Sequence, residues 1–165
     1  MFENIKSDLK AHKNDWTTQG FWAMLVYRFG RWRYQIQPTL LRKLLSLIYK
    51  VLYKLIQITT LIELPCQVEV GEGLRIDHFG PIVVNGYSKI GKNCVLRQGV
   101  TIGIKSAGDL SAPVIGDNVD IGCGAVILGG ITIGDNVKIG ANAVVINNVP
   151  DNCSVGGIPA KVISK

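Results

Sequence analysis

The chain is poor in the residues that build metal sites and disulfide frameworks. Its 165 residues include only two histidines, His12 and His78, and its four cysteines are spaced 28, 29 and 30 positions apart, with no CxxC pair. A zinc site needs three or four neighbouring ligands. Zinc-finger and thioredoxin-like functions are therefore excluded, and we expect no metal.

Charged residues are also scarce, at 18% of the chain, whereas hydrophobic residues make up 47%. This composition excludes a largely disordered chain, and the length fits one domain with a small extension. The first fifteen residues are polar and charged, unlike the apolar run of a secretory signal. We therefore expect a cytoplasmic protein whose cysteines stay reduced in packed positions.

The positive charge is confined to the first third of the chain. Residues 1–60 hold ten Lys and Arg against three Asp and Glu, whereas residues 61–165 hold eight against nine. No nucleic-acid-binding motif accompanies this charge. We therefore expect no nucleic-acid partner.

The same basic region predicts helices. Residues 2–15 suit a short polar helix, residues 20–35 carry aromatic side chains at helical spacing, and an apolar helix should cover residues 38–64 before Pro65. Basic residues interrupt this last helix, so it is too charged to span a membrane. Its apolar face can pack on the rest of the chain or on another copy, or residues 20–62 can contact an anionic membrane surface.

The rest of the chain repeats an aliphatic residue every six positions. A period of six fits neither an α-helix nor an ordinary strand, and is typical of a chain that coils with three short strands per turn. The aliphatic residue should fill the interior of a triangular prism, a small or β-branched residue should follow four positions later, and Gly or Asn at the bend tolerates positive φ. The twelve hexads, about four coils, begin at Val70, Ile76, Ile82, Ile90, Leu96, Ile102, Ile115, Ile121, Ile127, Ile133, Ile139 and Val145.

Two interruptions break this period. Two extra residues fall between Ile82 and Ile90, and the step from Ile102 to Ile115 has thirteen residues. The second interruption is polar and contains glycine, so residues 104–114 should form a loop that leaves the prism. Loops on a rigid scaffold often carry function, although a tolerated insertion is the alternative.

The hexads IGKNCV, IGDNVD, IGCGAV, IGDNVK and IGANAV, with GIPAK at residues 157–161, resemble those of hexapeptide-repeat acyltransferases. The resemblance covers residues 62–165 and implies a mainly β protein, a left-handed parallel β-helix, with residues 1–61 as a helical N-terminal region. Residues 62–103 resemble serine O-acetyltransferases and, more closely, O-acetyltransferases of bacterial polysaccharide biosynthesis. The family implies acetyl transfer from acetyl-CoA to a hydroxyl by a homotrimer, with active sites between adjacent prisms.

The most specific part of the resemblance is Asp77-His78, followed by a short loop and the sequence IVV. A hydroxyl attacks a thioester slowly until a base removes its proton, and an imidazole is suited to this near neutral pH. We therefore predict His78 as the catalytic base. The family places an acidic residue at the position of Glu63, where it orients the histidine, and the serine enzymes bind their acceptor with the residue that matches Asp77.

The acceptor site departs from the serine enzymes. They carry an Arg-His pair before a proline, and this pair grips the amino acid, whereas Ser111 and Ala112 precede Pro113 here. The missing pair favours a saccharide, with Asp77, Asn85 and Ser111 as candidate acceptor-binding residues. A short serine O-acetyltransferase of cysteine biosynthesis is the alternative.

The resemblance also implies a groove for the pantetheine arm of coenzyme A, which lies flat along the prism. Small residues are equally what the prism corners require, so a purely structural role stays open for each candidate. By position, the groove residues are Gly103, Cys123, Ala125, Ala141 and Pro159, with Lys138 or Lys161 near the phosphates.

The leading hypothesis is thus an O-acetyltransferase of capsule or exopolysaccharide synthesis, acting on a sugar or a lipid-linked sugar at the inner face of the cytoplasmic membrane. Carbonic anhydrases of this architecture need three histidine ligands, which this chain lacks. A trimeric scaffold without activity is disfavoured by the intact Asp77-His78 motif.

Overall fold

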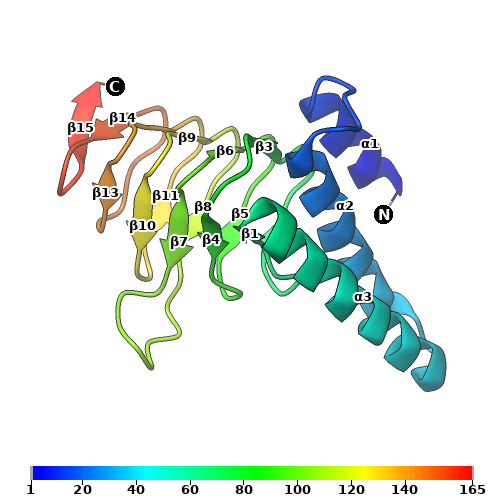
Figure 1. Cartoon of the computed structure of the whole chain (residues 1–165). Helices are drawn as coiled ribbons and strands as arrows, with labels where there is room; N and C mark the ends of the chain where they lie inside the picture. The colour runs from blue at the N-terminus through cyan, green and yellow to red at the C-terminus, as the bar shows by residue number, and fades with distance from the viewer. Residues whose placement is uncertain (1, 165) are drawn as a thin grey trace.

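The computed structural model describes residues 2–164, in which three helices precede a prism of short strands (Figure 1). The helices are α1 (Phe2–Ala11), α2 (Gln19–Trp32) and α3 (Thr39–Thr60), with a 3₁₀ turn, η1 (Arg33–Gln35), before α3. α2 and α3 pack side by side, and α3 extends away from the prism (Figure 1). Across residues 2–164, no helix has the length and apolar character needed to cross a membrane.

Two helices end earlier than the sequence predicts. The helix predicted over residues 38–64 ends at Thr60, because Leu61 takes a left-handed conformation (φ 60°) and Ile62 and Glu63 pair with a neighbouring strand instead. The helix predicted over residues 2–15 ends at Ala11, and its last predicted turn contains left-handed Lys13 and Asn14.

Within residues 2–164, fifteen short strands form three sheets, one on each face of the prism. All pairs are parallel except that of β14 with β15. Face A contains β1 (Ile62–Glu63), β4 (Ile82–Val84), β7 (Thr101–Gly103), β10 (Val126–Leu128) and β13 (Val144–Val145). Face B contains β2 (Glu69–Val70), β5 (Lys89–Ile90), β8 (Val114–Ile115) and β11 (Thr132–Ile133). Face C contains β3 (Arg75–Asp77), β6 (Val95–Arg97), β9 (Asp120–Ile121), β12 (Lys138–Ile139), β14 (Ser154–Gly156) and β15 (Lys161–Ser164).

This arrangement confirms the predicted parallel β-helix and its interior. Eleven of the twelve repeating residues are buried, and Val70, in the first coil, is half-buried. Face A has five strands, so the prism has five coils rather than four. The hexad count missed β1, which precedes the first hexad, and β14, which follows the last.

The two extra residues lie one corner earlier than predicted. Ile76 pairs with Leu96, and Val84, rather than Ile82, pairs with Ile102. The insertion therefore lies in the corner of residues 78–81, between faces C and A. The period alone misplaced it because Ile82 and Val84 both point inward and are both buried.

The corner between faces B and C is regular in successive coils. Its asparagines take positive φ, as predicted, and their side-chain amides form a ladder, with Nδ2 to Oδ1 distances of 3.4, 3.1 and 3.0 Å along Asn93, Asn118, Asn136 and Asn152. The glycines that follow the aliphatic residues are required for a different reason than backbone conformation. A Cβ at Gly91 would lie 2.4 Å from the carbonyl oxygen of Gly116, so close stacking of coils requires glycine there.

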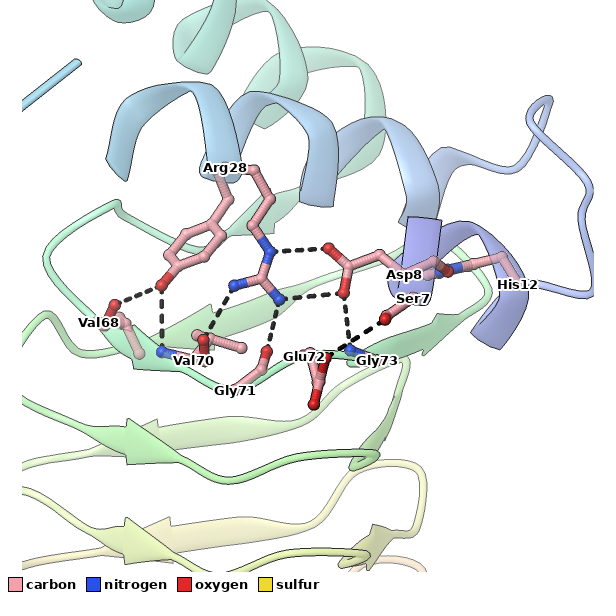
Figure 2. A network of polar contacts seen from close by, with 10 residues as sticks. Ser7, Asp8, His12, Arg28, Val68, Val70, Gly71, Glu72 and Gly73 are labelled. Atoms are coloured by element: carbon pink, nitrogen blue, oxygen red, sulfur yellow. Dashed lines mark hydrogen bonds and ion pairs between the residues drawn. The ribbon is translucent and has the colours of Figure 1, made fainter. Parts of the chain in front are cut away.

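The helices replace the coil that is missing beneath the first one. In later coils a corner N–H donates to the coil below, as Asn93 does to the oxygen of Glu72 at 2.9 Å. Gly73 holds the equivalent position in the first coil, and its N–H donates to Oδ1 of Asp8 at 3.0 Å (Figure 2). A solenoid end needs such a cap because its last strands carry unpaired backbone groups.

A buried ion pair holds this cap in place. Arg28 Nε lies 2.8 Å from Asp8 Oδ2, and the two side chains are 5% and 1% exposed. The Arg28 guanidinium also donates to the carbonyl oxygens of Val70, at 2.9 Å, and Gly71 (Figure 2). α1, α2 and the first coil are therefore fixed to one another, next to the end of β3.

Candidate active site

His78 begins the corner that contains the two extra residues. It follows β3, its side chain is exposed, and its φ of 69° is left-handed. This conformation costs a non-glycine residue about 1–2 kcal/mol. Strain of this kind persists where the surrounding structure imposes it, and it is concentrated at functional sites.

A cleft of about 550 Å³ separates this corner from the connection between α1 and α2. Its walls include Asp15 and Gln19 on the helical side and Arg75, Asp77 and His78 on the prism side. The residues that the motif singled out thus face a pocket formed by both parts of the chain.

Asp77 is already paired within its own strand. Arg75 Nε lies 2.9 Å from Asp77 Oδ1, and Arg75 Nη2 donates to Oδ2 at 3.1 Å. The side chains are 32% and 30% exposed, so the pair stands at the edge of the cleft. The motif singles out Asp77 but not Arg75. Arg75 is two residues earlier on the same strand, so its side chain points to the same side of the sheet as that of Asp77.

The second histidine lines the same cleft but is committed to structure. His12 is buried, and the N–H of Ile76 donates to its Nε2 at 3.1 Å. Its Nδ1–H therefore donates to the carbonyl oxygen of Asp8, at 2.7 Å. Both ring nitrogens are occupied, so His12 is not available as a base, whereas no group in residues 2–164 hydrogen-bonds to the His78 ring.

A column of residues continues from His78 along the corner between faces C and A. The strand registers pair Asp77 with Arg97, Leu96 with Ile121, and Ile121 with Ile139. Extending each register past the strand end stacks four residues at a coil spacing of about 4.8 Å. From the first coil upward they are His78, Gln98, Cys123 and Ala141.

This column leaves an open strip above His78. Cys123 is half-buried and Ala141 exposed, and both side chains are small. Cys123 and Ala141 are two of the predicted groove residues. Gln98, which the sequence did not single out, is exposed and lies against Gly80, one coil above the His78 corner. The sequence could assign Gln98 to the same corner as His78 only through the position of the insertion, and the hexad period misplaced that position.

The other predicted groove residues lie in different places. Ala125 is 0% exposed, so its methyl group packs in the prism core and cannot line a groove. Lys138 is exposed on face C. Pro159 and Lys161 belong to the C-terminal segment, which joins the end of face A through the Ala160 N–H and the Val144 oxygen, 2.8 Å apart.

Three predicted residues lie at the opposite corner, between faces A and B. Asn85 follows β4, and its Oδ1 accepts from the N–H of Tyr87 at 3.0 Å, while Gly103 ends β7. Ser111 lies in the loop of residues 104–113, and its N–H donates to Oδ1 of Asp109 at 2.8 Å. Hydrogen bonds from Ser111 lower the pKa of Asp109. Within one prism, face A separates these residues from His78.

Glu63 lies on face A. It is exposed in β1 and pairs with Val83, and among residues 2–164 no hydrogen bond joins it to His78. Burial, and secondarily the negative charge of Glu63, raise the pKa of Tyr53 on α3. Glu63 is thus near α3, and its orienting role is still a prediction.

The three faces differ in the chemistry of their outward side chains. Face B carries the Glu69–Lys89 ion pair, 3.1 Å long, and face C carries the Arg97–Asp120 pair. Above Glu63 in β1, face A instead presents a β-branched row in register that is apolar except for Thr101: Val83, Thr101, Val126 and Val144. Face A is therefore the face best suited to burial against another chain.

The coiled prism and its histidine-bearing corner define a class, the β-helical acyltransferases. Residues 112–147 match the family described as bacterial transferase hexapeptide (six repeats). The chain is 34% identical over 160 residues to a protein of Escherichia coli named as a colanic acid biosynthesis acetyltransferase, WcaB, covering 94% of this chain and 96% of WcaB. It is 37% identical over 147 residues to a serine acetyltransferase of Synechococcus elongatus, covering 87% of this chain and 57% of that enzyme. The chain belongs to the hexapeptide-repeat transferases, a family of acyltransferase enzymes.

Solved structures agree with this assignment. The Neisseria gonorrhoeae serine acetyltransferase in complex with serine superposes with a TM-score of 0.80 at 31% identity, covering 99% of this chain and 69% of that one. The Brucella abortus serine acetyltransferase in complex with coenzyme A gives 0.82 at 29% identity, covering 99% and 68%. The match includes the helices and the prism, and it supports the left-handed β-helix.

Proposed function

We propose that this protein transfers an acetyl group from acetyl-CoA to a hydroxyl of a saccharide, with His78 as the base. One observation carries the proposal: the corner between faces C and A contains two extra residues, and it presents His78 in a left-handed conformation with an exposed ring. The next coil forms the equivalent corner with two fewer residues, so the stacking of coils alone does not require the irregularity.

His78 would act on protons alone. Its imidazole takes the proton of the acceptor hydroxyl as the new O–C bond forms, and it returns the proton to the departing sulfur as the C–S bond breaks. Arg75 and Asp77 stand beside it at the cleft edge, where their polar atoms can hydrogen-bond to an acceptor.

The column above His78 fits an elongated donor. The side chains of Cys123 and Ala141 are small, so the strip stays open over two coils. Lys138 and Lys161 are exposed cations toward the end of the prism. Acetyl-CoA would supply the thioester carbonyl at the foot of this strip. The coenzyme A complex of the Brucella abortus relative supports this donor.

The charge at the cleft favours a neutral acceptor. The Asp77 carboxylate is compensated by Arg75 at 2.9 Å, so a substrate ammonium would have to compete with a guanidinium that is already in place. Ser111 and Ala112 supply no cation for a substrate carboxylate. A zwitterionic amino acid therefore lacks the carboxylate clamp at residues 111–112 and has to displace Arg75 to pair with Asp77, whereas a sugar needs only hydrogen bonds.

The length of the relatives points the same way. The chain spans 96% of WcaB, named for colanic acid biosynthesis, but only 57% of the Synechococcus elongatus serine acetyltransferase. The serine reading is the second candidate, because serine acetyltransferases are prominent among both sequence relatives and structural neighbours.

A trimer would complete the site. The predicted site residues divide between the two corners that flank face A, and face A is the apolar face. Three copies that bury face A around a threefold axis would bring the His78 corner of one copy to the Ser111 corner of the next. Val126→Lys should then give monomers with little activity, whereas Val114→Lys on face B should not; a wild-type monomer that is fully active would exclude the shared site.

Release of the coenzyme A thiol tests the acceptor directly. The panel contains L-serine, monosaccharides and oligosaccharide fragments of bacterial polysaccharides, with His78→Ala as the blank. L-Serine should fall about 10-fold to 100-fold below the best saccharide, because it loses a charge-assisted hydrogen bond. Efficient turnover of L-serine with no saccharide used would replace the saccharide proposal with the serine one.

A further inference from the structure

We propose that the outer face of α3 docks on the surface of an anionic lipid bilayer. This inference concerns where the protein works and goes beyond the acceptor and the chemistry of His78.

α3 has two faces of different character. One stripe packs against α2, η1 and the first coil and holds the helix in place: Leu45, Tyr49, Tyr53, Ile56 and Thr60. The remaining surface is mostly large aliphatic side chains in solvent, between 37% and 83% exposed: Leu40, Leu41, Leu44, Leu47, Ile48, Val51, Leu52, Leu55 and Ile58.

This outer face is long as well as apolar. The 22 residues of α3 extend over about 33 Å at 1.5 Å per residue. The helix projects away from the prism, so neither the strands nor α1 cover it (Figure 1). An exposed apolar surface of this extent on a soluble domain marks an interaction site.

The charges around this face have one sign. Residues 16–62 contain seven Lys and Arg and no Asp or Glu. Arg28 and Arg33 are buried, but Arg42, Lys43, Lys50 and Lys54 are exposed on α3. Lys43, Lys50 and Lys54 follow one another at seven and four positions, so they form a single row along the border of the apolar face.

This distribution of charge favours a lipid bilayer, rather than a second copy of α3, as the partner of the apolar face. Two copies packed through this face would bring two rows of cations together without an acidic partner, which opposes association. Anionic headgroups supply the missing charge, and the acyl region just beneath them takes the aliphatic side chains. The helix would lie in the plane of the interface, because it cannot cross the membrane.

Flotation of the full chain with lipid vesicles tests this proposal. One set contains phosphatidylcholine with roughly one-third phosphatidylglycerol, and the other contains phosphatidylcholine alone. Wild type should float with the anionic set and bind it less at high salt. Removing the cation row in Lys43→Gln/Lys50→Gln/Lys54→Gln should weaken binding about 100-fold, because each lysine near the surface contributes a similar increment.

The control removes three exposed lysines elsewhere, in Lys6→Gln/Lys10→Gln/Lys105→Gln, and should bind as wild type does within a few-fold. Leu44→Gln/Leu55→Gln tests the apolar part against Leu110→Gln/Ile163→Gln, and only the first pair should lose binding. Circular dichroism and sedimentation establish that each variant is folded with unchanged mass.

Three results would overturn the proposal. Wild type that does not float, binding that ignores the cation row, or a fall in assembly mass on Leu44→Gln/Leu55→Gln would each exclude a bilayer, and the last would assign the face to another copy. Acetyl transfer to a soluble acceptor should be the same in wild type and in the two sets of α3 variants. Vesicle flotation therefore tests the docking proposal and coenzyme A release tests the saccharide proposal, so either one can fail without the other.

Discussion

The two histidines of this chain line one cleft but belong to opposite kinds of structure. His12 is buried in the cap of the first coil, and both of its ring nitrogens hydrogen-bond to backbone. His78 stands in an irregular corner, exposed and in a left-handed conformation. The comparison shows that the partners of an imidazole, rather than its position in the cleft, separate a structural residue from a candidate base.

The same contrast extends to the surrounding backbone. At the capped end, Asp8, His12 and Tyr27 replace the hydrogen bonds that a preceding coil would make. At the His78 corner, two residues are added that no neighbouring coil matches. We therefore expect substitutions at the cap to change stability and substitutions at the corner to change activity.

His78→Ala should have the largest effect on activity. Loss of a positioned base lowers kcat about 10²-fold to 10⁴-fold. The exposed ring makes no hydrogen bond within residues 2–164, so the unfolding temperature should stay close to that of wild type. Steady-state kinetics and calorimetry check this pair of results, and activity within a few-fold of wild type would remove His78 from the mechanism.

Asp8→Ala should have the largest effect on stability. It leaves the buried Arg28 guanidinium without its partner and the Gly73 N–H without an acceptor, which should lower the free energy of unfolding by about 3–5 kcal/mol. Urea denaturation measures the loss. Asp8→Ala/Arg28→Met should recover part of it, and Asp15→Ala, in an exposed turn, is the control.

His12→Ala should lower stability more than activity, which is the opposite of the result expected for His78→Ala. The Ile76 N–H loses its acceptor, so the free energy of unfolding should fall by about 1–3 kcal/mol. His12→Gln, whose amide oxygen can accept the same bond, should lose less. Acetyl transfer per folded molecule should stay within about tenfold of wild type, and a loss as deep as that of His78→Ala would mean that His12 takes part in the chemistry.

The smallest and most local effect should be a change in the rate at which the Cys123 thiol is labelled. Cys123 is half-buried in the column above His78, whereas Cys66, Cys94 and Cys153 are buried. Burial also raises the pKa of Cys94 to about 11, so its thiol stays protonated at neutral pH. A maleimide should label Cys123 first, and coenzyme A should slow that labelling; equal labelling with and without coenzyme A would remove Cys123 from the donor strip.

The sequence predicted the prism well because its interior follows one short period. Every hexad residue from Ile76 to Val145 is buried, and Asn93, Asn118 and their equivalents take positive φ. The cap could not be predicted in this way. Asp8 meets Gly73 across 65 positions, and no periodicity relates the helices to the first coil.

The site was predicted only in part, for a related reason. His78 and Asp77 were found through a motif, and Cys123 and Ala141 through their small size. Gln98, Arg75 and the true place of the insertion depend on strand register, which two adjacent inward residues, Ile82 and Val84, made ambiguous. The ion pair between Asp77 and Arg75 likewise becomes visible only in the folded chain.

Making the corner regular tests the central claim most directly. Residues 78–81 are replaced by the dipeptide Gln-Gly, which forms the equivalent corner at Gln98 and Gly99. The variant should keep its β-helix and its unfolding temperature, because the new corner repeats one that the prism already contains. Its acetyl transfer, measured as coenzyme A release with the best saccharide, should fall at least as far as that of His78→Ala. A regular-corner variant that still transfers acetyl groups at the wild-type rate would contradict the account.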